Sequence, residues 1–262
     1  MKIRVVSAVI AILILVPFII VGGIPYAIMI SLLGILSYKE ILELKKSHEK
    51  YPLIIKILGL ISLIYIIIGD YGINSLNYAV NYVKLVLPLV LILLPTVLCK
   101  KEKYNTKDAI YLLGSVYLLG FLFNLLIIIR ALDIRLLLYL ISITIFTDTF
   151  AYAIGCLIGK HKISSISPNK SWEGSIAGLI GGVSIALIIY ANLIVPLSFK
   201  LVIVTIILSI VGQLGDLFYS KIKRENNLKD FSNIMPGHGG LLDRIDSLTF
   251  VVFTYVLLLW FL

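Results

Sequence analysis

Long apolar runs alternate with short polar segments along the whole of this chain. Because an α-helix needs about 20 apolar residues to cross the hydrocarbon core of a bilayer, each such run predicts one membrane-spanning helix. The fold class that this pattern predicts is all-α, a polytopic integral membrane protein. Measured against that length there are about nine spans, with limits at 4–22, 24–43, 52–69, 82–99, 108–129, 134–155, 174–195, 199–220 and 247–262.

The composition agrees with a membrane protein and excludes an ordinary water-soluble domain. Of the 262 residues 60% are hydrophobic and 14% are charged, and the mean hydropathy is +1.06, which is more apolar sequence than a soluble core needs. The first run follows a basic start, as in a signal peptide, but it lacks a convincing cleavage site, so we expect a transmembrane helix. Cys99 and Cys156 have no metal-binding spacing, and we expect thiols within the membrane, neither disulfide-bonded nor metal-bound.

The positions of the lysines and arginines predict how the chain is oriented. If the N-terminus is cytoplasmic, the inner segments are the start, 39–56, 100–107, 156–173 and 220–246. Of the 23 basic residues only four then fall on the other side, namely Lys84, Arg130, Arg135 and Lys200. The positive-inside rule therefore supports a cytoplasmic N-terminus and an outward C-terminus. Orientation and anionic lipid explain the formal net charge of +9, so we expect no nucleic acid partner.

Two cytoplasmic segments, 159–174 and 220–246, mix basic residues with serine, asparagine, proline and glycine, whereas the other loops are short and merely charged. We therefore expect N-terminal transmembrane helices over 1–107, with room for a homodimer interface, and a catalytic transmembrane region over 108–262. Its active site would face the cytoplasm from the cell membrane. Glycines recur every four residues in the seventh span, at Gly174, Gly178 and Gly182. This spacing lets another helix backbone approach closely.

Asp148 lies inside the sixth predicted span, in the stretch TIFTDTFAYAIG. A charged side chain at membrane depth is costly in free energy and usually has a function. A role in a functional site is the interpretation that we favour. A structural hydrogen bond to Thr144, Thr147 or a neighbouring helix is the alternative.

Three more aspartates lie near the cytoplasmic ends of the last two spans. Asp216 precedes Ser220 by four residues, and Asp243 precedes Asp246 by three, so each pair shares one face of a helix. Carboxylates gathered at one membrane surface repel one another unless a cation lies among them. Since the chain has no thiolate or histidine cluster, these hard oxygen ligands favour Mg²⁺. The alternative is a salt-bridge network of the aspartates with Lys223, Arg224 and Arg244.

The turn PGHGG, residues 236–240, comes just before the last span. Its glycines let backbone N–H groups approach a ligand, and it leads into a helix N-terminus, which attracts phosphate. His238 within it suits phosphate binding, proton transfer or a bracing hydrogen bond equally well. The loop 159–174 adds donors compatible with phosphate, although an ordinary polar loop has the same composition. These donors are Ser167, Asn169, Lys170 and Ser171.

Together these features indicate Mg²⁺-dependent chemistry on a phosphorylated compound, with one reactant in the lipid. The segment 220–246 moreover resembles the signature of the phosphatidate cytidylyltransferases, also called CDP-diacylglycerol synthases. The matching positions are Ser220, Lys223-Arg224, Lys229-Asp230, Pro236, His238-Gly239-Gly240 and Asp243-Arg244-Ile245-Asp246. The stretch DTFAYAIGCLIGKHKISSISPNKSWEG, from residue 148 to residue 174, is similar to a second block of that family. The N-terminal half is similar only as a set of spans.

The resemblance implies an all-helical membrane enzyme that converts CTP and phosphatidic acid into CDP-diacylglycerol and pyrophosphate. It implies Mg²⁺, with room for a second, monovalent cation such as K⁺, on the metal ligands Asp216, Ser220, Asp243 and Asp246. The catalytic residues that it implies are Asp216, Asp243, Asp246, Lys223, Arg244 and His238. The substrate-binding residues that it implies are Asp148, Ser167, Lys170, Ser171, Lys223, Arg224, Gly239 and Gly240.

Two other functions are the alternatives. A CTP-dependent lipid kinase would move the γ-phosphate of CTP, and the complete His-Gly-Gly…Asp-Arg-x-Asp pattern argues against it. A cation or proton transporter would need acidic residues buried along several spans. Here the acidic residues cluster at one face beside basic loops, which favours phosphate chemistry.

Overall fold

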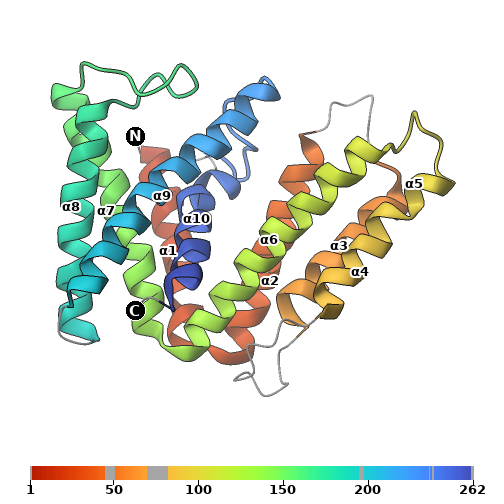
Figure 1. Ribbon diagram of the computed structural model, residues 1–262, viewed down its shortest axis with the longest axis horizontal. Coiled ribbons are helices and arrows are strands. Elements are labelled where there is room, and N and C mark those ends of the chain that lie inside the picture. Colours follow the sequence, from red (N-terminus) through yellow and green to blue (C-terminus); the bar gives the residue numbers. More distant parts are fainter. Residues whose placement is uncertain are drawn as a thin grey trace. The chain divides into compact units, whose positions relative to one another are not determined.

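The described part of the protein is helical. The computed structural model describes residues 2–44, 51–69, 82–194, 198–235, 237 and 239–260, and within these ranges it contains helices and no β-strand (Figure 1). In chain order the helices are α1 (Lys2–Val21), α2 (Gly23–Glu43), α3 (Leu53–Ile68), α4 (Tyr82–Leu93), α5 (Pro95–Leu98), α6 (Thr106–Leu132), α7 (Ile134–Ile158), α8 (Trp172–Leu193), α9 (Phe199–Glu225) and α10 (Leu242–Leu258).

Each predicted span coincides with helical structure, which confirms the all-α class. Within the described ranges five helices are long and apolar enough to cross a membrane, namely α2, α6, α7, α8 and α9. The apolar helical stretches Val9–Val21, Leu53–Ile68 and Tyr82–Leu98 are shorter, and α10 has 17 residues. The structure therefore supports a membrane protein with several apolar helices, and the count of nine spans stays a prediction.

The fourth predicted span, 82–99, is interrupted near its end. α4 ends at Leu93, and the single turn α5 begins at Pro95. Because proline has no N–H group, it cannot donate a helical hydrogen bond to the preceding turn. The carbonyl oxygen of Leu93, at this break, accepts a hydrogen bond from the hydroxyl group of Thr96 (Oγ1···O 2.6 Å). The predicted span at 82–99 thus corresponds to the apolar helical stretch Tyr82–Leu98 with a local break at Leu94.

The chain divides into two compact units. The first consists of Met1–Ala131 with Phe231–Leu241, and the second of Leu132–Asp230 with Leu242–Leu262. Nearly all of α6 thus belongs to the first unit, although the expected catalytic region begins at residue 108. The expected division at residue 107 separates a catalytic region from the other helices. The compact units do not test a division by function, so it stays a prediction.

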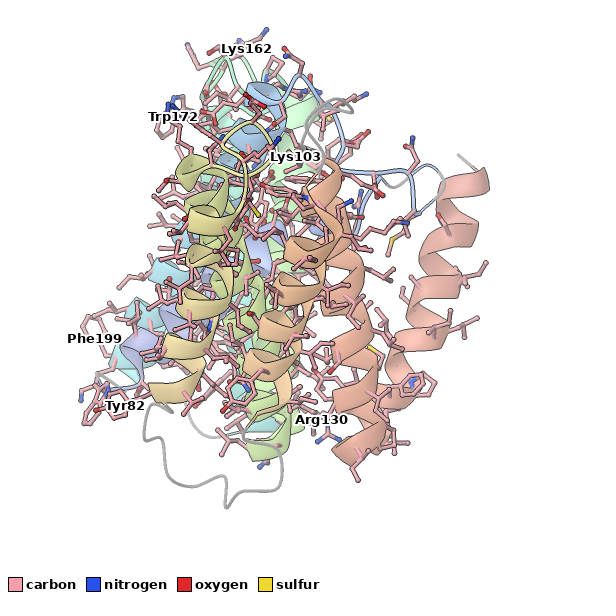
Figure 2. All side chains as sticks on the ribbon, turned by 90° about the vertical axis from the view of Figure 1, so that its right-hand side faces the viewer. Tyr82, Lys103, Arg130, Lys162, Trp172 and Phe199 are labelled. Carbon is pink, nitrogen blue, oxygen red and sulfur yellow. The ribbon has the colours of Figure 1, made fainter. Side chains whose placement is uncertain are left out.

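The first unit is held together by close packing of α2, α3 and α6. The side-chain amide of Asn124 on α6 donates to the carbonyl oxygen of Ile67 on α3 (Nδ2···O 2.9 Å). A methyl group built on Gly120 of α6 would lie 2.8 Å from Cγ2 of Ile66, so only glycine allows this approach. Side chains fill the unit along its length, with Lys103 and Arg130 at opposite ends (Figure 2).

In the second unit α7 packs along α8, and α9 packs along α10. A methyl group built on Gly178 would lie 2.6 Å from the carbonyl oxygen of Thr147 and 2.9 Å from Cβ of Ala151 on α7. Gly174 and Gly182 meet the same helix, which confirms that the glycine spacing serves helix packing. A hydrogen bond between Thr147 and Ser209 (Oγ1···Oγ 2.9 Å) joins α7 to α9. Cys99 and Cys156 are free thiols.

Candidate active site

Asp216, near the C-terminal end of α9, is the centre of a polar cluster in the second unit. The ammonium group of Lys170 forms an ion pair with its Oδ2 atom. The hydroxyl group of Ser220, one helical turn further on, donates to its Oδ1 atom (3.3 Å). This contact confirms that the four-residue spacing puts Asp216 and Ser220 on one face of the helix.

A second ion pair joins α9 to α10. The Nζ atom of Lys223 lies 2.6 Å from Oδ1 of Asp243, and the two side chains are 11% and 5% exposed. Lys223 is in the last turn of α9 and Asp243 is in the first turn of α10. A cation at a helix C-terminus and an anion at a helix N-terminus both interact favourably with the helix dipole. Two predicted site residues from different helices are therefore brought together by the fold.

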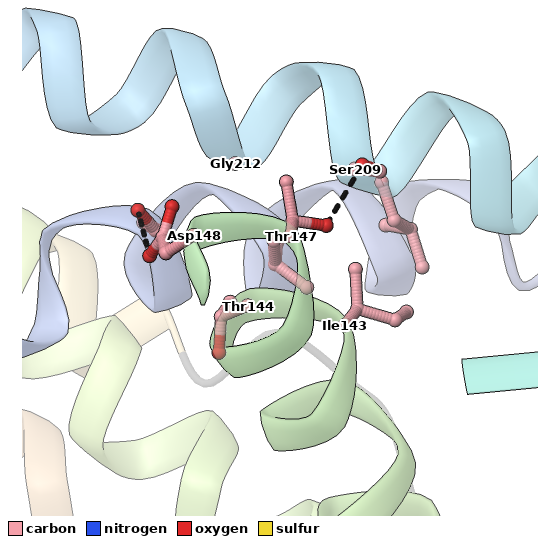
Figure 3. A pocket seen from close by; sticks show the side chains of 9 residues that line it. Ile143, Thr144, Thr147, Asp148, Ser209 and Gly212 are labelled. Carbon is pink, nitrogen blue, oxygen red and sulfur yellow. Dashed lines mark hydrogen bonds between the residues drawn. The ribbon is translucent and has the colours of Figure 1, made fainter. Parts of the chain in front are cut away.

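Asp148 on α7 faces α9 and α10 across a narrow pocket (Figure 3). Its Oδ2 atom accepts a hydrogen bond from the hydroxyl group of Ser247 (3.3 Å), which is a partner on a neighbouring helix. Thr144 bonds instead to the carbonyl oxygen of Ile141. The pocket is lined by Ile143, Thr144, Thr147, Asp148, Leu208, Ser209, Gly212, Ser247 and Val251.

Asp246 lies close enough to the other aspartates to be affected by their charges. Burial raises the pKa of the Asp246 carboxyl group above its usual range, and the charges of Asp216 and then Asp148 raise it further. The Lys223 ammonium opposes this effect. Repulsion among these carboxylates is relieved when a cation binds near them.

The donor set fits a hard cation that is shared with a ligand. Within the described ranges no three acidic, histidine or cysteine side chains lie close enough to hold a metal ion by themselves. Mg²⁺ commonly binds through one or two carboxylates and completes its shell with water and substrate phosphates. The carboxylates of the second unit suit that arrangement better than a cage made only of protein ligands.

The loop between α7 and α8 holds Lys170 by backbone hydrogen bonds. The N–H of Ile163 donates to the carbonyl oxygen of Lys170 (3.1 Å), and the N–H of Lys170 donates to the carbonyl oxygen of Ser167 (3.1 Å). The hydroxyl group of Ser171 caps α8 by accepting from the N–H of Gly174 (3.1 Å). Ser171 therefore has a structural partner, and its contact with substrate stays a prediction.

The two arginines of the predicted site differ in their surroundings. Arg224 donates to the carbonyl oxygens of Ile166 (Nε···O 3.3 Å) and Leu228 (Nη1···O 2.9 Å), so it braces the loop that precedes α8. Arg244 is exposed on the first turn of α10. The ion pairs to Asp216 and Asp243 come from two lysines, Lys170 and Lys223. Lys223 forms one of the contacts that the salt-bridge alternative predicted, with Asp243, whereas the pairing of Lys170 with Asp216 was not part of that prediction.

The glycine turn belongs to the first unit. Gly237 and Gly239 have φ angles of +77° and +83°, which side chains disfavour. Met235 and Gly239 exchange two backbone hydrogen bonds, of 3.0 and 3.1 Å. Gly239 and Gly240 are buried. Pro236 and His238 lie outside the described residues, so the role of His238 stays a prediction.

The structure adds polar groups that the sequence analysis missed. The hydroxyl group of Ser175 on α8 donates to the side-chain oxygen of Gln213 on α9, and the amide of Gln213 donates back to the carbonyl oxygen of Ser175 (3.3 Å). Gln213 lies three residues before Asp216 and inside the predicted span 199–220. A polar side chain at such a position is a sequence signal for a site residue. Glu40, on α2, is fully buried. It lies within the predicted span 24–43, and its position inside an apolar run was the available signal.

Comparison with known proteins agrees with the motifs. The profile of the cytidylyltransferase family matches residues 2–262. A phosphatidate cytidylyltransferase of Staphylococcus haemolyticus is 36% identical over 255 residues, which cover 96% of each chain. Those of Staphylococcus saprophyticus and Staphylococcus aureus (strain COL) are 36% and 33% identical over 258 and 264 residues, again 96% of each chain. The chain therefore belongs to the cytidylyltransferase family.

Proposed function

We propose that this protein transfers the cytidylyl group of CTP to phosphatidic acid, which yields CDP-diacylglycerol and pyrophosphate for phospholipid biosynthesis. The observation that carries the proposal is the pair of lysine–aspartate contacts in the second unit, Lys170 with Asp216 and Lys223 with Asp243. Lys170 lies in one of the two blocks of sequence that resemble phosphatidate cytidylyltransferases, Lys223 and Asp243 lie in the other, and Asp216 lies four residues before that second block. The relatives that match nearly the whole chain carry that name.

Each ion pair offers one partner for a phosphate and one for a metal ion. When an anionic phosphate and a cation bind together, the lysine ammonium can turn to the phosphate while the aspartate turns to the cation. No charge is left without a partner by this exchange, which avoids the large cost of an unpaired buried charge. An ion pair of low exposure, such as Lys223–Asp243, is well suited to it.

The reaction needs charge stabilisation more than proton transfer. A phosphate oxygen of phosphatidic acid attacks the α-phosphorus of CTP and forms a new P–O bond. The bond between the α-phosphorus and the bridging oxygen breaks, and pyrophosphate leaves with the electron pair. The nucleophile is already an anion, so no strong general base is required. Lys170, Lys223, Arg224 and Arg244 would offset repulsion between the two anions and stabilise the leaving pyrophosphate.

The proposed metal ligands are Asp216, Asp243 and Asp246, with the hydroxyl group of Ser220 beside Asp216. A bound Mg²⁺ would supply neutralisation and alignment of the phosphates. A second, monovalent cation such as K⁺ is part of the same proposal. Asp148, with its Ser247 partner, would border this cluster from α7.

The finer topology also belongs to the proposal. We propose nine spans, a cytoplasmic N-terminus and an active site at the cytoplasmic face of the cell membrane, since this arrangement puts most basic residues inside. Within the second unit, Lys162 and Trp172 lie near one end and Phe199 lies near the other (Figure 2). A homodimer through the N-terminal helices is proposed, and nucleic acid is not a proposed partner.

The decisive experiment follows the label from CTP. Purified protein in detergent–lipid micelles receives Mg²⁺, phosphatidic acid and CTP labelled on either the α- or the γ-phosphate. We expect label in lipid only from the α-position. Transfer from the γ-position, tested also with diacylglycerol and a polyprenol, would instead make the protein a lipid kinase. The absence of transfer from both positions over a panel of lipids would leave transport as the better explanation.

A further inference from the structure

Glu40 is a fully buried carboxylate in the last turn of α2, inside the first unit. Its Oε1 atom accepts a hydrogen bond from the hydroxyl group of Ser232 (2.6 Å) and another from the backbone N–H of Leu241 (2.7 Å). These two donors stand at opposite ends of the segment Phe231–Leu241, which belongs to the same unit. One oxygen atom thus holds both ends of that segment.

Two further contacts extend this arrangement into the segment. The hydroxyl group of Ser232 donates to Glu40, and its oxygen atom accepts a hydrogen bond from the N–H of Ile234 (3.3 Å). Gly240 packs directly on the carboxylate, because a methyl group built on it would lie 2.6 Å from Oε1 and 2.9 Å from Oε2 of Glu40. A side chain at residue 240 would therefore displace the Glu40 carboxylate.

We propose that Glu40 is a positioning residue, which holds the glycine turn of segment 231–241 in the shape that the reaction needs. The proposal deepens the proposed function and rests on it, with the substrate-binding role of Gly239 and Gly240 that the family resemblance implies. Glu40 itself touches neither substrate nor reacting atoms. It acts through the backbone of Leu241 and the side chain of Ser232.

Physical chemistry favours an anchor over an incidental contact. Burying a carboxylate costs free energy unless hydrogen bonds satisfy it, and a carboxylate forms stronger hydrogen bonds with N–H and O–H donors than a neutral acceptor does. Leu241 directly precedes α10, whose first turn carries Asp243. Glu40, on an N-terminal helix outside the two signature blocks, thereby shapes the segment that leads into the catalytic motif.

The test uses the full chain in micelles and three variants of similar size. Glu40→Leu removes the oxygen atom that accepts both hydrogen bonds, whereas Glu40→Gln keeps a side-chain oxygen at the same place. Glu43→Gln is the matched control, since Glu43 lies on the same helix and its side chain is 54% exposed. Hydrogen exchange followed by mass spectrometry reports on segment 231–241 whether or not the enzyme is active.

We expect exchange in segment 231–241 to be at least about 10-fold faster in Glu40→Leu, intermediate in Glu40→Gln and unchanged in Glu43→Gln, because a buried N–H that loses its acceptor is strongly destabilised. The kcat/KM for CDP-diacylglycerol formation should fall about 10- to 100-fold in Glu40→Leu. It should recover in large part in Glu40→Gln.

A second measurement links Glu40 to Gly240. Gly240→Ala should lower kcat/KM in the wild-type background and lower it less in a Glu40→Ala background, where the new methyl group has room. If Gly240→Ala lowers kcat/KM by the same factor in both backgrounds, the proposed coupling between residue 240 and Glu40 is refuted. Unchanged exchange in Glu40→Leu would overturn the anchor, and faster exchange with full activity would overturn its role in the reaction. If the wild type makes no CDP-diacylglycerol, the proposed function fails, and hydrogen exchange still decides about the anchor.

Discussion

The ammonium group of Lys223 lies 2.6 Å from the carboxylate of Asp243, and this contact joins the last turn of α9 to the first turn of α10. Buried ion pairs add little net stability, because the lost hydration of both charges offsets their attraction. Removal of one partner is far more costly, because the other charge is then left alone. The pair is therefore better explained as two preformed ligand-binding groups than as a device for stability.

Asp243→Asn should abolish turnover while the protein stays folded and membrane-inserted. The side-chain oxygen of asparagine can still accept from Lys223, but a neutral amide is a poor ligand for a divalent cation. We expect cytidylyl transfer to fall at least about 100-fold, measured with α-labelled CTP. Glu225→Gln, an exposed change on α9 whose parent side chain is 62% exposed, serves as the control. Near-normal activity of Asp243→Asn would refute the metal assignment.

Lys170→Met should lower kcat/KM by about 100-fold, because it removes the cation that pairs with Asp216 and that we expect to meet a phosphate. Lys162→Met is the matched control in the same loop. The side chain of Lys162 is exposed, and the backbone of Lys162 pairs with that of Ser171, next to Lys170. Steady-state kinetics at varied CTP would compare them. Equal losses in the two variants would mean that Lys170 contributes only general positive charge.

Removal of divalent cations should stop the reaction. Asp148, Asp216 and Asp246 affect one another electrostatically, and the charge of two phosphorylated substrates adds to theirs. With excess chelator we expect no CDP-diacylglycerol, and addition of Mg²⁺ should restore its formation. The Mg²⁺ concentration for half-maximal rate should rise in Asp246→Asn. Full turnover under chelation would exclude the proposed role of the metal.

Gly178→Ala should destabilise the packing of α7 on α8. The new methyl group would lie 2.6 Å from the carbonyl oxygen of Thr147, so the helices must separate, at a cost of about 1–3 kcal/mol. Gly114→Ala on α6 is the control, because a methyl group there meets nothing within 4 Å. It should be neutral or stabilising by up to about 1 kcal/mol. Thermal unfolding in detergent distinguishes the two, and equal midpoints would contradict the packing argument.

The sequence alone determined the helical elements and the chemistry that they carry. Apolar runs and the 3.6-residue period are local signals, so each predicted span coincides with helical structure, and the shared face of Asp216 and Ser220 was predicted from their spacing. The signature residues also identified the family. A local signal sufficed in these cases because each involves residues within a few turns of one helix.

The tertiary structure decided which charged groups meet. Lys223 and Asp243 are 20 residues apart, and Glu40 and Leu241 are 201 residues apart. Contacts at such separations depend on how helices pack, and no period or spacing within one helix encodes them. The sequence offered both a metal cluster and a salt-bridge network, and packing paired the aspartates with Lys170 and Lys223 in particular. The sequence analysis assigned no role to Glu40, and only its burial and its hydrogen bonds to Ser232 and Leu241 in the fold indicate an anchor.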